Sequence, residues 1–474
     1  MIDQPHLWTA APLNRRRFFN ISGGVLMAGA LAACGSNNGR SDSSSVGGSS
    51  SAAPAAGGSS SAAASSGAVA SSTAGSSGAA ASTSAASPGG NATLAQWYHQ
   101  YGEAGTQQAV EKYAANYTGA KVSVQWVPGD YDTKVSSSLL TAAGPDVFEF
   151  GNGPNIDQIQ GGQVVALDGV LGSAASDFTQ SLVKRMTYKG KLYAVPQVID
   201  MQLLVYRKSM LSKAGVKPPT TFDELVAAAK KLTSSDVKGL FLGNDGGAGV
   251  MGGPALWSVG SDYLTSDNKS GFGDPNLPKA LAGLHTLFSS GSLLLGAPTD
   301  WSDPSAITQG LTAMQWTGLW TFPVLQKELG ADFGVLPWPK FSSAIGAPSV
   351  PIGAYGSAVS AKSKNPEAAK AFVKYLWVDN TADQLDFAQS FGFHIPARQS
   401  VAAKADKLKS GVAADAVAIT QKYGKAQTPL LWTSADTTAY SDALNNIIKN
   451  GADPVAELAK LQKTVTAELA RVQK

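Results

Sequence analysis

The sequence predicts an α/β protein whose folded part divides into two lobes. Strand and helix signals alternate along residues 91–474, as they do in proteins that pack helices against a mostly parallel sheet. This stretch of about 384 residues is longer than a single hydrophobic core usually supports, so two lobes are expected. Residues 1–90 have a different composition and predict a separate, unfolded organisation.

Three segments have the pattern of strands. Residues 121–127 alternate apolar side chains, such as Val122 and Trp126, with polar ones, which is typical of a strand with one buried face. Residues 146–150 and 203–206 are short apolar runs of strand length. We therefore expect strands at these three places.

Three helices have clear start signals. Thr221 and Glu224 form a capping box, whereas Asn365 and Asp453 each stand as an N-cap before a proline at the first helical position. Apolar residues then recur on one face of each helix. The predicted buried faces comprise Phe222, Leu225, Val226, Ala229 and Leu232; Ala369, Phe372, Val373, Leu376 and Trp377; and Val455, Leu458, Leu461, Val465 and Leu469.

The first 33 residues predict an export signal. Arg15, Arg16 and Arg17 precede an uncharged stretch from residue 21 to residue 33, which has the length of a signal-peptide hydrophobic region. A transmembrane helix is the weaker interpretation, because it needs roughly 20 apolar residues. Residues 14–20 resemble the twin-arginine export signal, and an ordinary secretory signal with three arginines is the alternative.

Cys34, the only cysteine in the chain, is predicted to carry lipid. Residues 31–35 resemble the bacterial lipobox, in which small residues precede a cysteine that accepts a diacylglyceryl group. A buried core cysteine, the alternative, would not stand between a hydrophobic region and a Ser/Gly tract. Because two acyl chains suffice for stable anchoring, we expect the mature protein on the extracytoplasmic face of the cell membrane.

Residues 34–90 predict a disordered linker behind the lipidated cysteine. They are almost entirely Ser, Ala and Gly, a composition that cannot bury enough apolar surface to fold. Such a linker reaches about 40 Å on average, which would hold the folded part clear of the membrane.

Charge and motifs exclude several classes of function. The chain has 37 basic and 34 acidic residues without a large basic block, so nucleic acid is not an expected partner. The glycine-rich segment 247–252 lies among further glycines and Pro254, which favours a loop over a dinucleotide site, so no cofactor is expected. His99, His285 and His394 lie far apart in the sequence, so neither a metal site nor catalytic residues are assigned.

Several segments, in their order and spacing behind a lipobox, resemble the extracellular solute-binding proteins of sugar ABC transporters, of the maltose-binding type. Each motif alone is weak, and Arg207 stands where asparagine is common in the family. The segments are the "PDV" strand at 144–148, the "GK.Y..P…YN" segment at 190–196 and 204–208, "AG…PPTTWDEL" at 214–225, "AM…G.W" at 313–320 and "GV.PLP" at 333–337.

The resemblance implies a two-lobed periplasmic-binding-protein-like fold with crossing hinge segments. Carried onto this chain, it puts 91–200 and 334–380 in lobe one and 201–333 and 381–474 in lobe two. Ligand binds between the lobes, which close around it by a hinge motion. Membrane permease subunits then recognise the closed form, and a monomer is expected.

Sugars present hydroxyls at their edges and C–H groups on their faces, so carboxylates, amides and aromatic rings are the expected contacts. Polar or aromatic side chains that follow predicted strands, lie at the first crossover or occupy the family's cleft segments are candidates. One of the two tryptophans at 316 and 320 is expected in the core, as are Trp97, Trp338 and Trp377. The candidates are Tyr98, His99, Glu103, Asn152, Asp200, Trp257, Trp316, Trp320, Tyr355 and Trp432.

Two functions remain open at this point. The first is a non-enzymatic receptor that delivers a carbohydrate to an ABC importer. A neutral mono- or oligosaccharide is favoured over a phosphate-bearing ligand, because the candidate cleft segments contain no Lys or Arg. The second is a secreted, lipid-anchored carbohydrate-active enzyme of the glycosidase kind, for which the spacing of carboxylates selects no catalytic pair.

Overall fold

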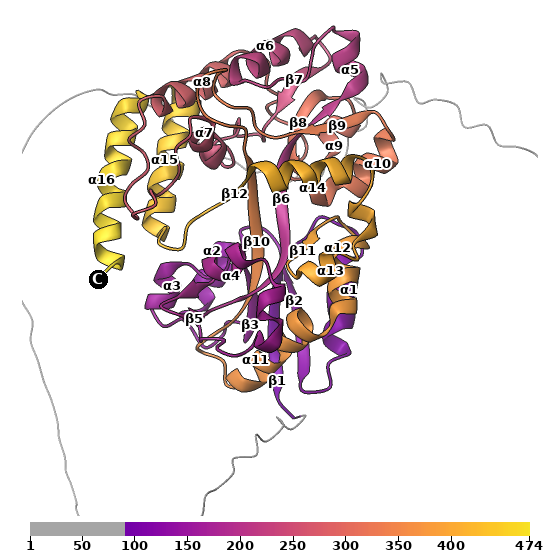
Figure 1. Cartoon of the computed structure of the whole chain (residues 1–474), viewed down its shortest axis with the longest axis vertical. Helices are drawn as coiled ribbons and strands as arrows, with labels where there is room; N and C mark the ends of the chain where they lie inside the picture. Colours follow the sequence, from indigo (N-terminus) through magenta and orange to yellow (C-terminus); the bar gives the residue numbers. More distant parts are fainter. Residues whose placement is uncertain (1–90) are drawn as a thin grey trace, which may run out of the picture. The chain divides into compact units, whose positions relative to one another are not determined.

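The computed structural model describes residues 91–474 (Figure 1). The predicted signal segment, the lipidation site Cys34 and the linker to residue 90 lie outside the described residues. Within the described part, no helix combines the length and the apolar character that crossing a membrane requires.

Strands and helices alternate from the start of the described part, as the sequence predicts. The first half of the chain forms β1 (Thr93–His99), α1 (Thr106–Ala115), β2 (Lys121–Val127), α2 (Tyr131–Ser138), β3 (Val147–Gly151), α3 (Ile156–Gln160), η1 (Gly172–Asp177), α4 (Gln180–Arg185), β4 (Thr187–Tyr188), β5 (Lys191–Leu192), β6 (Val195–Arg207), α5 (Lys208–Lys213), α6 (Phe222–Leu232), β7 (Lys238–Phe241), α7 (Gly252–Ser258) and α8 (Leu277–Ser289).

Helices dominate the second half. Its elements are α9 (Ser305–Thr308), β8 (Thr312–Gly318), η2 (Leu319–Thr321), α10 (Phe322–Leu329), β9 (Phe333–Leu336), β10 (Val350–Val359), α11 (Pro366–Lys374), η3 (Tyr375–Asp379, a π-helical turn), α12 (Thr381–Gln389), β11 (Ile395–Pro396), α13 (Gln399–Ala402), η4 (Asp406–Leu408), α14 (Gly411–Tyr423), β12 (Gly424–Ala426), α15 (Ser434–Asn450) and α16 (Pro454–Val472).

One hydrogen-bonded sheet runs through the described part in the order β2-β1-β3-β10-β6-β8-β7. The pairs β1–β2, β1–β3 and β7–β8 are parallel, whereas β10 is antiparallel to β3 and β6, and β6 is antiparallel to β8. Figure 1 shows the long strands β6 and β10 side by side between two groups of helices. These two strands therefore connect the two halves of the sheet.

Three hydrophobic clusters fill the space around this sheet. The first packs β1, β3, α11 and α12 and takes Val195 to Ile199 from β6. The second packs α6, α8, α15 and α16, and the third packs β9, α10 and α14; these two share the far half of β6, which includes Leu203 and Leu204. A single strand thus contributes to opposite cores, which is how β6 crosses from one lobe to the other.

The clusters differ from the expected lobe boundaries in two places. Phe333 of β9 packs in the third cluster, because β9 pairs with the far half of β6. Phe387 of α12 packs in the first cluster, where its ring meets Trp377 edge-on at 5.5 Å. The second crossing consequently lies in β10, after residue 350 rather than at 334, and the chain stays in the first lobe beyond residue 380.

The predicted helices form, and two details of them differ from the prediction. The capping box of α6 is formed, with the amide of Glu224 donating to Thr221 Oγ1 at 3.3 Å. Asn365 precedes α11 but does not cap it, because its side chain instead donates to the carbonyl of Thr93 at 3.3 Å. Val455 was predicted to face inward, yet it is 61% exposed, because it lies in the first turn of α16, ahead of the buried stripe.

Candidate ligand-binding cleft

Two adjoining cavities lie where the two lobes meet the crossing strands. The larger, of about 600 Å³, is lined by the loop after β1, the end of β3, the crossing strands β6 and β10, and residues around 301–304 and 320–324. The smaller, of about 340 Å³, is lined mainly by α7 and α15 and by aromatic rings. Both contain Gln202, Trp301 and Gln427, so they form one elongated cleft.

Most of the predicted contact residues line this cleft. Trp257 and Trp432 lie in the smaller cavity. Six others, which come from both lobes and from both crossing strands, line the larger one: His99, Glu103, Asn152, Asp200, Trp320 and Tyr355.

Tyr98 and Trp316 are buried and line neither cavity. Because side chains alternate along a strand, Tyr98 of β1 enters the core when its neighbour His99 faces the cleft. Trp316 lies in β8, whose residues are all buried, and its Nε1 donates to Gln202 Oε1 at 3.1 Å. Direct ligand contact is therefore not expected of either residue, and Trp316 instead supports Gln202 from behind.

His394 joins two carboxylates at the wall of the larger cavity. Its Nδ1 bonds to Asp200 and its Nε2 lies 3.4 Å from Glu103 Oε1, while the residue is only 3% exposed. Burial lowers the pKa of this imidazole, but Asp200 and Glu103 outweigh it and raise the pKa to about 10. His394 is therefore a cation at neutral pH and neutralises part of the acidic wall.

From the sequence alone, His394 is a candidate only for a metal site, which is not assigned. Its partners lie 194 and 291 residues away in the chain, so only the fold brings them together. Within the described residues, no group of three or more His, Cys, Asp or Glu side chains has the arrangement of a metal site. The contacts that the fold gives this histidine are with two carboxylates of the cleft wall.

A second histidine, His99, lies on a buried carboxylate. Its backbone amide and its Nδ1 both meet Glu149 Oε1, at 2.9 and 2.5 Å, and its ring stacks on Tyr355 with centroids 4.5 Å apart. Tyr101 donates to the other oxygen of Glu149 at 2.8 Å. Glu149 could not be recognised from the sequence, because a lone acidic residue inside an apolar strand has no motif of its own.

Aromatic rings wall the cleft at both ends. In the larger cavity Trp301 meets Trp320 edge-on at 5.8 Å, and Trp320 is held by a bond from its Nε1 to the carbonyl of Ser302. In the smaller one Trp432 meets Tyr263 edge-on at 4.9 Å. Rings fixed in this way offer flat apolar surfaces beside polar groups, which suits the faces and edges of a sugar.

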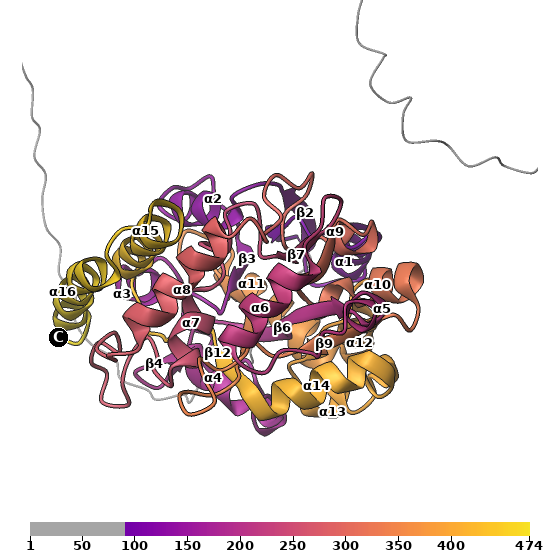
Figure 2. The same cartoon turned by 90° about the horizontal axis from the view of Figure 1, so that it is seen from above.

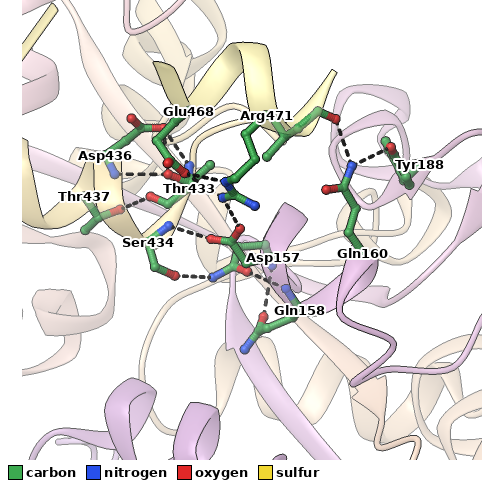
Figure 3. Close-up of polar contacts among 12 residues, drawn as sticks. Asp157, Gln158, Gln160, Tyr188, Thr433, Ser434, Asp436, Thr437, Glu468 and Arg471 are labelled. Atoms are coloured by element: carbon green, nitrogen blue, oxygen red, sulfur yellow. Dashed lines mark hydrogen bonds and ion pairs between the residues drawn. The ribbon is translucent and has the colours of Figure 1, made fainter. Parts of the chain in front are cut away.

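A polar cluster joins the lobes beside the smaller cavity (Figure 3). Asp157 of α3 accepts bonds from Arg471 at 2.6 Å and from the backbone amide of Ser434 at 3.0 Å. Gln160 also donates to the carbonyl of Val472 at 2.8 Å. Because α3 packs in the first cluster and α15 and α16 pack in the second, these bonds form an interlobe latch. Figure 2 shows α3 next to α16.

Comparison with known proteins identifies the family. The model of the bacterial extracellular solute-binding proteins matches residues 96–377, which is more than half of the chain. The chain belongs to this family. The matched part includes the loop after β1, both crossing strands and the aromatic segment 313–320, whereas His394, Gln427 and the α15 residues of the cleft lie beyond it.

Individual members of this family resemble the chain over most of its length. The diacetylchitobiose binding protein DasA of Streptomyces coelicolor is 26% identical over 359 residues, which cover 72% of this chain and 80% of that protein. The galactooligosaccharide-binding protein of Bacillus subtilis is 24% identical over 341 residues, covering 67% and 78%.

A solved structure confirms the predicted fold. The solute-binding protein of Thermotoga lettingae, bound with alpha-D-tagatose, superposes with a TM-score of 0.69 at 22% identity and covers 80% of this chain and 100% of its own. At this level of identity the likeness concerns the fold alone, which is the two-lobed α/β fold expected from the sequence.

Proposed function

We propose that this solute-binding protein captures a neutral carbohydrate in its interlobe cleft and delivers it to the membrane subunits of an ABC importer. The observation that carries the proposal is the lining of the cleft, where aromatic rings from both lobes flank carboxylates and amides on the crossing strands. Binding that engages both lobes favours their closed arrangement, since a ligand shifts an equilibrium by its difference in affinity for the two states.

The charges of the lining support a neutral ligand. Neither cavity is lined by Lys or Arg within the described residues, whereas a phosphate group is usually met by such cations. Glu103 and Asp200 are available as hydroxyl acceptors and share the cation His394. The names of the relatives, a diacetylchitobiose and a galactooligosaccharide binding protein, agree with an uncharged sugar.

The length of the cleft favours an oligosaccharide over a single sugar ring. The cavities of about 600 and 340 Å³ share Gln202 and Gln427, so one ligand can extend through both. A chain of two or more rings would place one ring against Trp320 and another against Trp432.

The alternative of a carbohydrate-active enzyme is not favoured. The members of this family bind solutes rather than transform them. The two carboxylates of the larger cavity that lie closest to His394 share that histidine. Both carboxylates therefore contact the same cation, whereas an acid and a base of a glycosidase require two different environments.

We further propose that the protein acts as a lipid-anchored monomer on the extracytoplasmic face of the cell membrane. Support comes from the lipobox around Cys34 and from the arginine-rich export signal at residues 14–20. The Ser/Gly/Ala tract to residue 90 would then keep the cleft within reach of the permease.

A thermal-shift panel of the full-length protein tests the proposed ligand class. The panel comprises diacetylchitobiose, galactooligosaccharides, maltooligosaccharides and mannobiose, with glycerophosphocholine as the charged comparison. A ligand at a hundred times its Kd stabilises by about 2.7 kcal/mol, so at least one neutral sugar should raise Tm by several degrees. A shift with glycerophosphocholine alone would contradict the proposal.

The latch gives a prediction about closure. Replacing Arg471 with glutamine should weaken binding of the best sugar about two- to fivefold, because a half-exposed ion pair contributes little and must break when the lobes part. Glu468→Gln is the matched control, since Glu468 pairs with Arg471 within α16 and leaves the interlobe bond to Asp157 in place. Equal Kd values for wild type and Arg471→Gln in calorimetry would argue against the latch.

A further inference from the structure

Glu149 is a fully buried carboxylate directly behind the cleft. It lies in β3, is 1% exposed and lines neither cavity. Its Oε1 meets the backbone amide and Nδ1 of His99, and its Oε2 accepts the hydroxyl of Tyr101. In the orientation that satisfies both its neighbours, the amide of Gln197 also donates to Oε2, at 3.1 Å.

A buried carboxylate without partners would be strongly destabilising, so this arrangement has to offset a large desolvation cost. Four donors converge on the two oxygens, and one of them belongs to an imidazole. The hydroxyl of Tyr131 adds bonds to the carbonyls of Glu149 and Trp97, at 2.9 and 3.0 Å, which tie β3 to β1. The carboxylate and the strand that carries it are therefore fixed.

The contact determines what His99 offers to the cleft. With Nδ1 held by Glu149, Nε2 is the ring nitrogen that has no partner among the described residues. Because a carboxylate only accepts hydrogen bonds, Nδ1 is the donor to Glu149, and Nε2 donates into the cleft when the ring carries its second proton. Burial lowers the pKa of His99, but Glu149 outweighs it and the net pKa is raised, which favours the doubly protonated ring. Glu103 and Asp200 in the cleft act in the same direction, and Asp132 of α2 is a further carboxylate near this histidine.

We propose that Glu149 is a positioning residue that holds His99 as a hydrogen-bond donor into the cleft, where it selects an acceptor oxygen of the ligand. A ring, glycosidic or amide carbonyl oxygen fits this role, whereas a hydroxyl hydrogen does not. The inference rests on the proposed function for its ligand, but the state of His99 is a property of the protein alone.

The neighbouring rings make the orientation strict. Tyr355 stacks on His99 at an interplanar angle of 14°, and the ring of Tyr101 lies 3.8 Å from it, centroid to centroid. Since Glu149 bonds to both His99 and Tyr101, its loss would release two cleft side chains together. Loss of Glu149 would therefore lower the affinity for the ligand through His99 and Tyr101, although Glu149 itself does not line the cleft.

Titration of the histidine ring signals by NMR, without ligand, tests the first half of the proposal. His99, assigned with a His99→Gln variant, should titrate above the ordinary value of about 6.5 in wild type and lower by about one unit or more in Glu149→Gln. Glu111→Gln removes an exposed carboxylate of α1 and should leave the titration unchanged. A wild-type His99 that titrates at or below 6.5 overturns the proposal, even if Glu149→Gln fails to fold.

Calorimetry with the best sugar of the panel tests the second half. At pH 7, His99→Gln and Glu149→Gln should each weaken binding about tenfold or more, as expected for a hydrogen bond from a charged donor. The double variant should be no weaker than the worse single variant, because both remove the same donor. Lowering the pH from 8 to 6 should restore the affinity of Glu149→Gln for the sugar, because it protonates the ring of His99. A general packing defect would not be repaired by this change of pH.

The outcomes separate this proposal from the proposed function. Additive losses in the double variant, or no recovery at pH 6, overturn the role of Glu149 while the protein still binds sugar. If no sugar binds at all, the proposed function fails, and the ligand-free titration still decides whether Glu149 holds His99 protonated.

Discussion

Replacing His394 with glutamine is expected to destabilise the protein by about 3–5 kcal/mol, because it removes the cation from a buried ion-pair network. Glu103 and Asp200 would then face each other in the wall of the cleft with no positive charge between them. Denaturant unfolding at pH 7 measures the loss. Unchanged stability would mean that water or rearrangement compensates the carboxylates.

The same variant should change how stability depends on pH. The pKa of His394 is about 10 in the folded protein against 6.5 ordinarily, since Asp200 and Glu103 outweigh the effect of burial. A group whose pKa is raised by folding stabilises fully below its unfolded pKa and loses that contribution as pH rises through the folded pKa. Wild type should therefore lose stability from about pH 6.5 to pH 10, and His394→Gln should lose less.

His285 provides the matched control for this prediction. It is a partly buried histidine whose Nδ1 meets the carbonyl of Ile448, and it has no carboxylate partner among residues 91–474. His285→Gln should cost about 1 kcal/mol at most, as expected for one hydrogen bond, and should keep the wild-type pH dependence. If the free energy of unfolding depended on pH identically in wild type and His394→Gln, the ion-pair network of His394 could not be the cause of that dependence.

Replacing Trp320 with alanine should weaken sugar binding about thirtyfold or more, which is the effect of losing a central aromatic contact of about 2 kcal/mol. Trp320 lines the larger cavity and is only partly buried, so the fold should tolerate its removal. Calorimetric titration with the best sugar of the panel measures the loss in affinity.

Two further variants sharpen the interpretation of Trp320. A Cβ at Gly318 would lie 1.8 Å from the ring of Trp320. Gly318→Ala should therefore displace the ring and weaken sugar binding, although the tryptophan is still present. Trp97→Ala is the control, because Trp97 packs against the first cluster and lines neither cavity. If Trp97→Ala weakened binding as much as Trp320→Ala, loss of stability rather than of a contact would explain both.

Local patterns in the sequence predicted much of the fold. The capping box at Thr221 and the alternation along residues 121–127 depend on neighbours in the chain, and both elements form as expected. The crossing points were harder to place, because the apolar run at 333–336 suits a strand in either lobe. Only its pairing with the far half of β6 assigns it to the second lobe.

The candidate site was predictable where a residue type and its place in the chain sufficed. Asn152 closely follows the predicted strand at 146–150 and lines the cleft together with His99, whereas Tyr98 is one position before His99 and faces the core. The buried partners of the site could not be predicted, because Glu149 contacts Tyr101 and His99, which lie some 50 residues earlier in the chain. No local pattern marks such long-range pairing.

The proposed function requires that the cleft bind one neutral oligosaccharide across both lobes. Calorimetric titration of the full-length protein with the best sugar of the panel measures this binding. We expect saturable binding of one sugar per chain, with a negative heat-capacity change from the apolar surface that the rings bury. No binding heat with any neutral sugar of the panel, or binding that Trp320→Ala and Asp200→Ala leave unchanged, would contradict it.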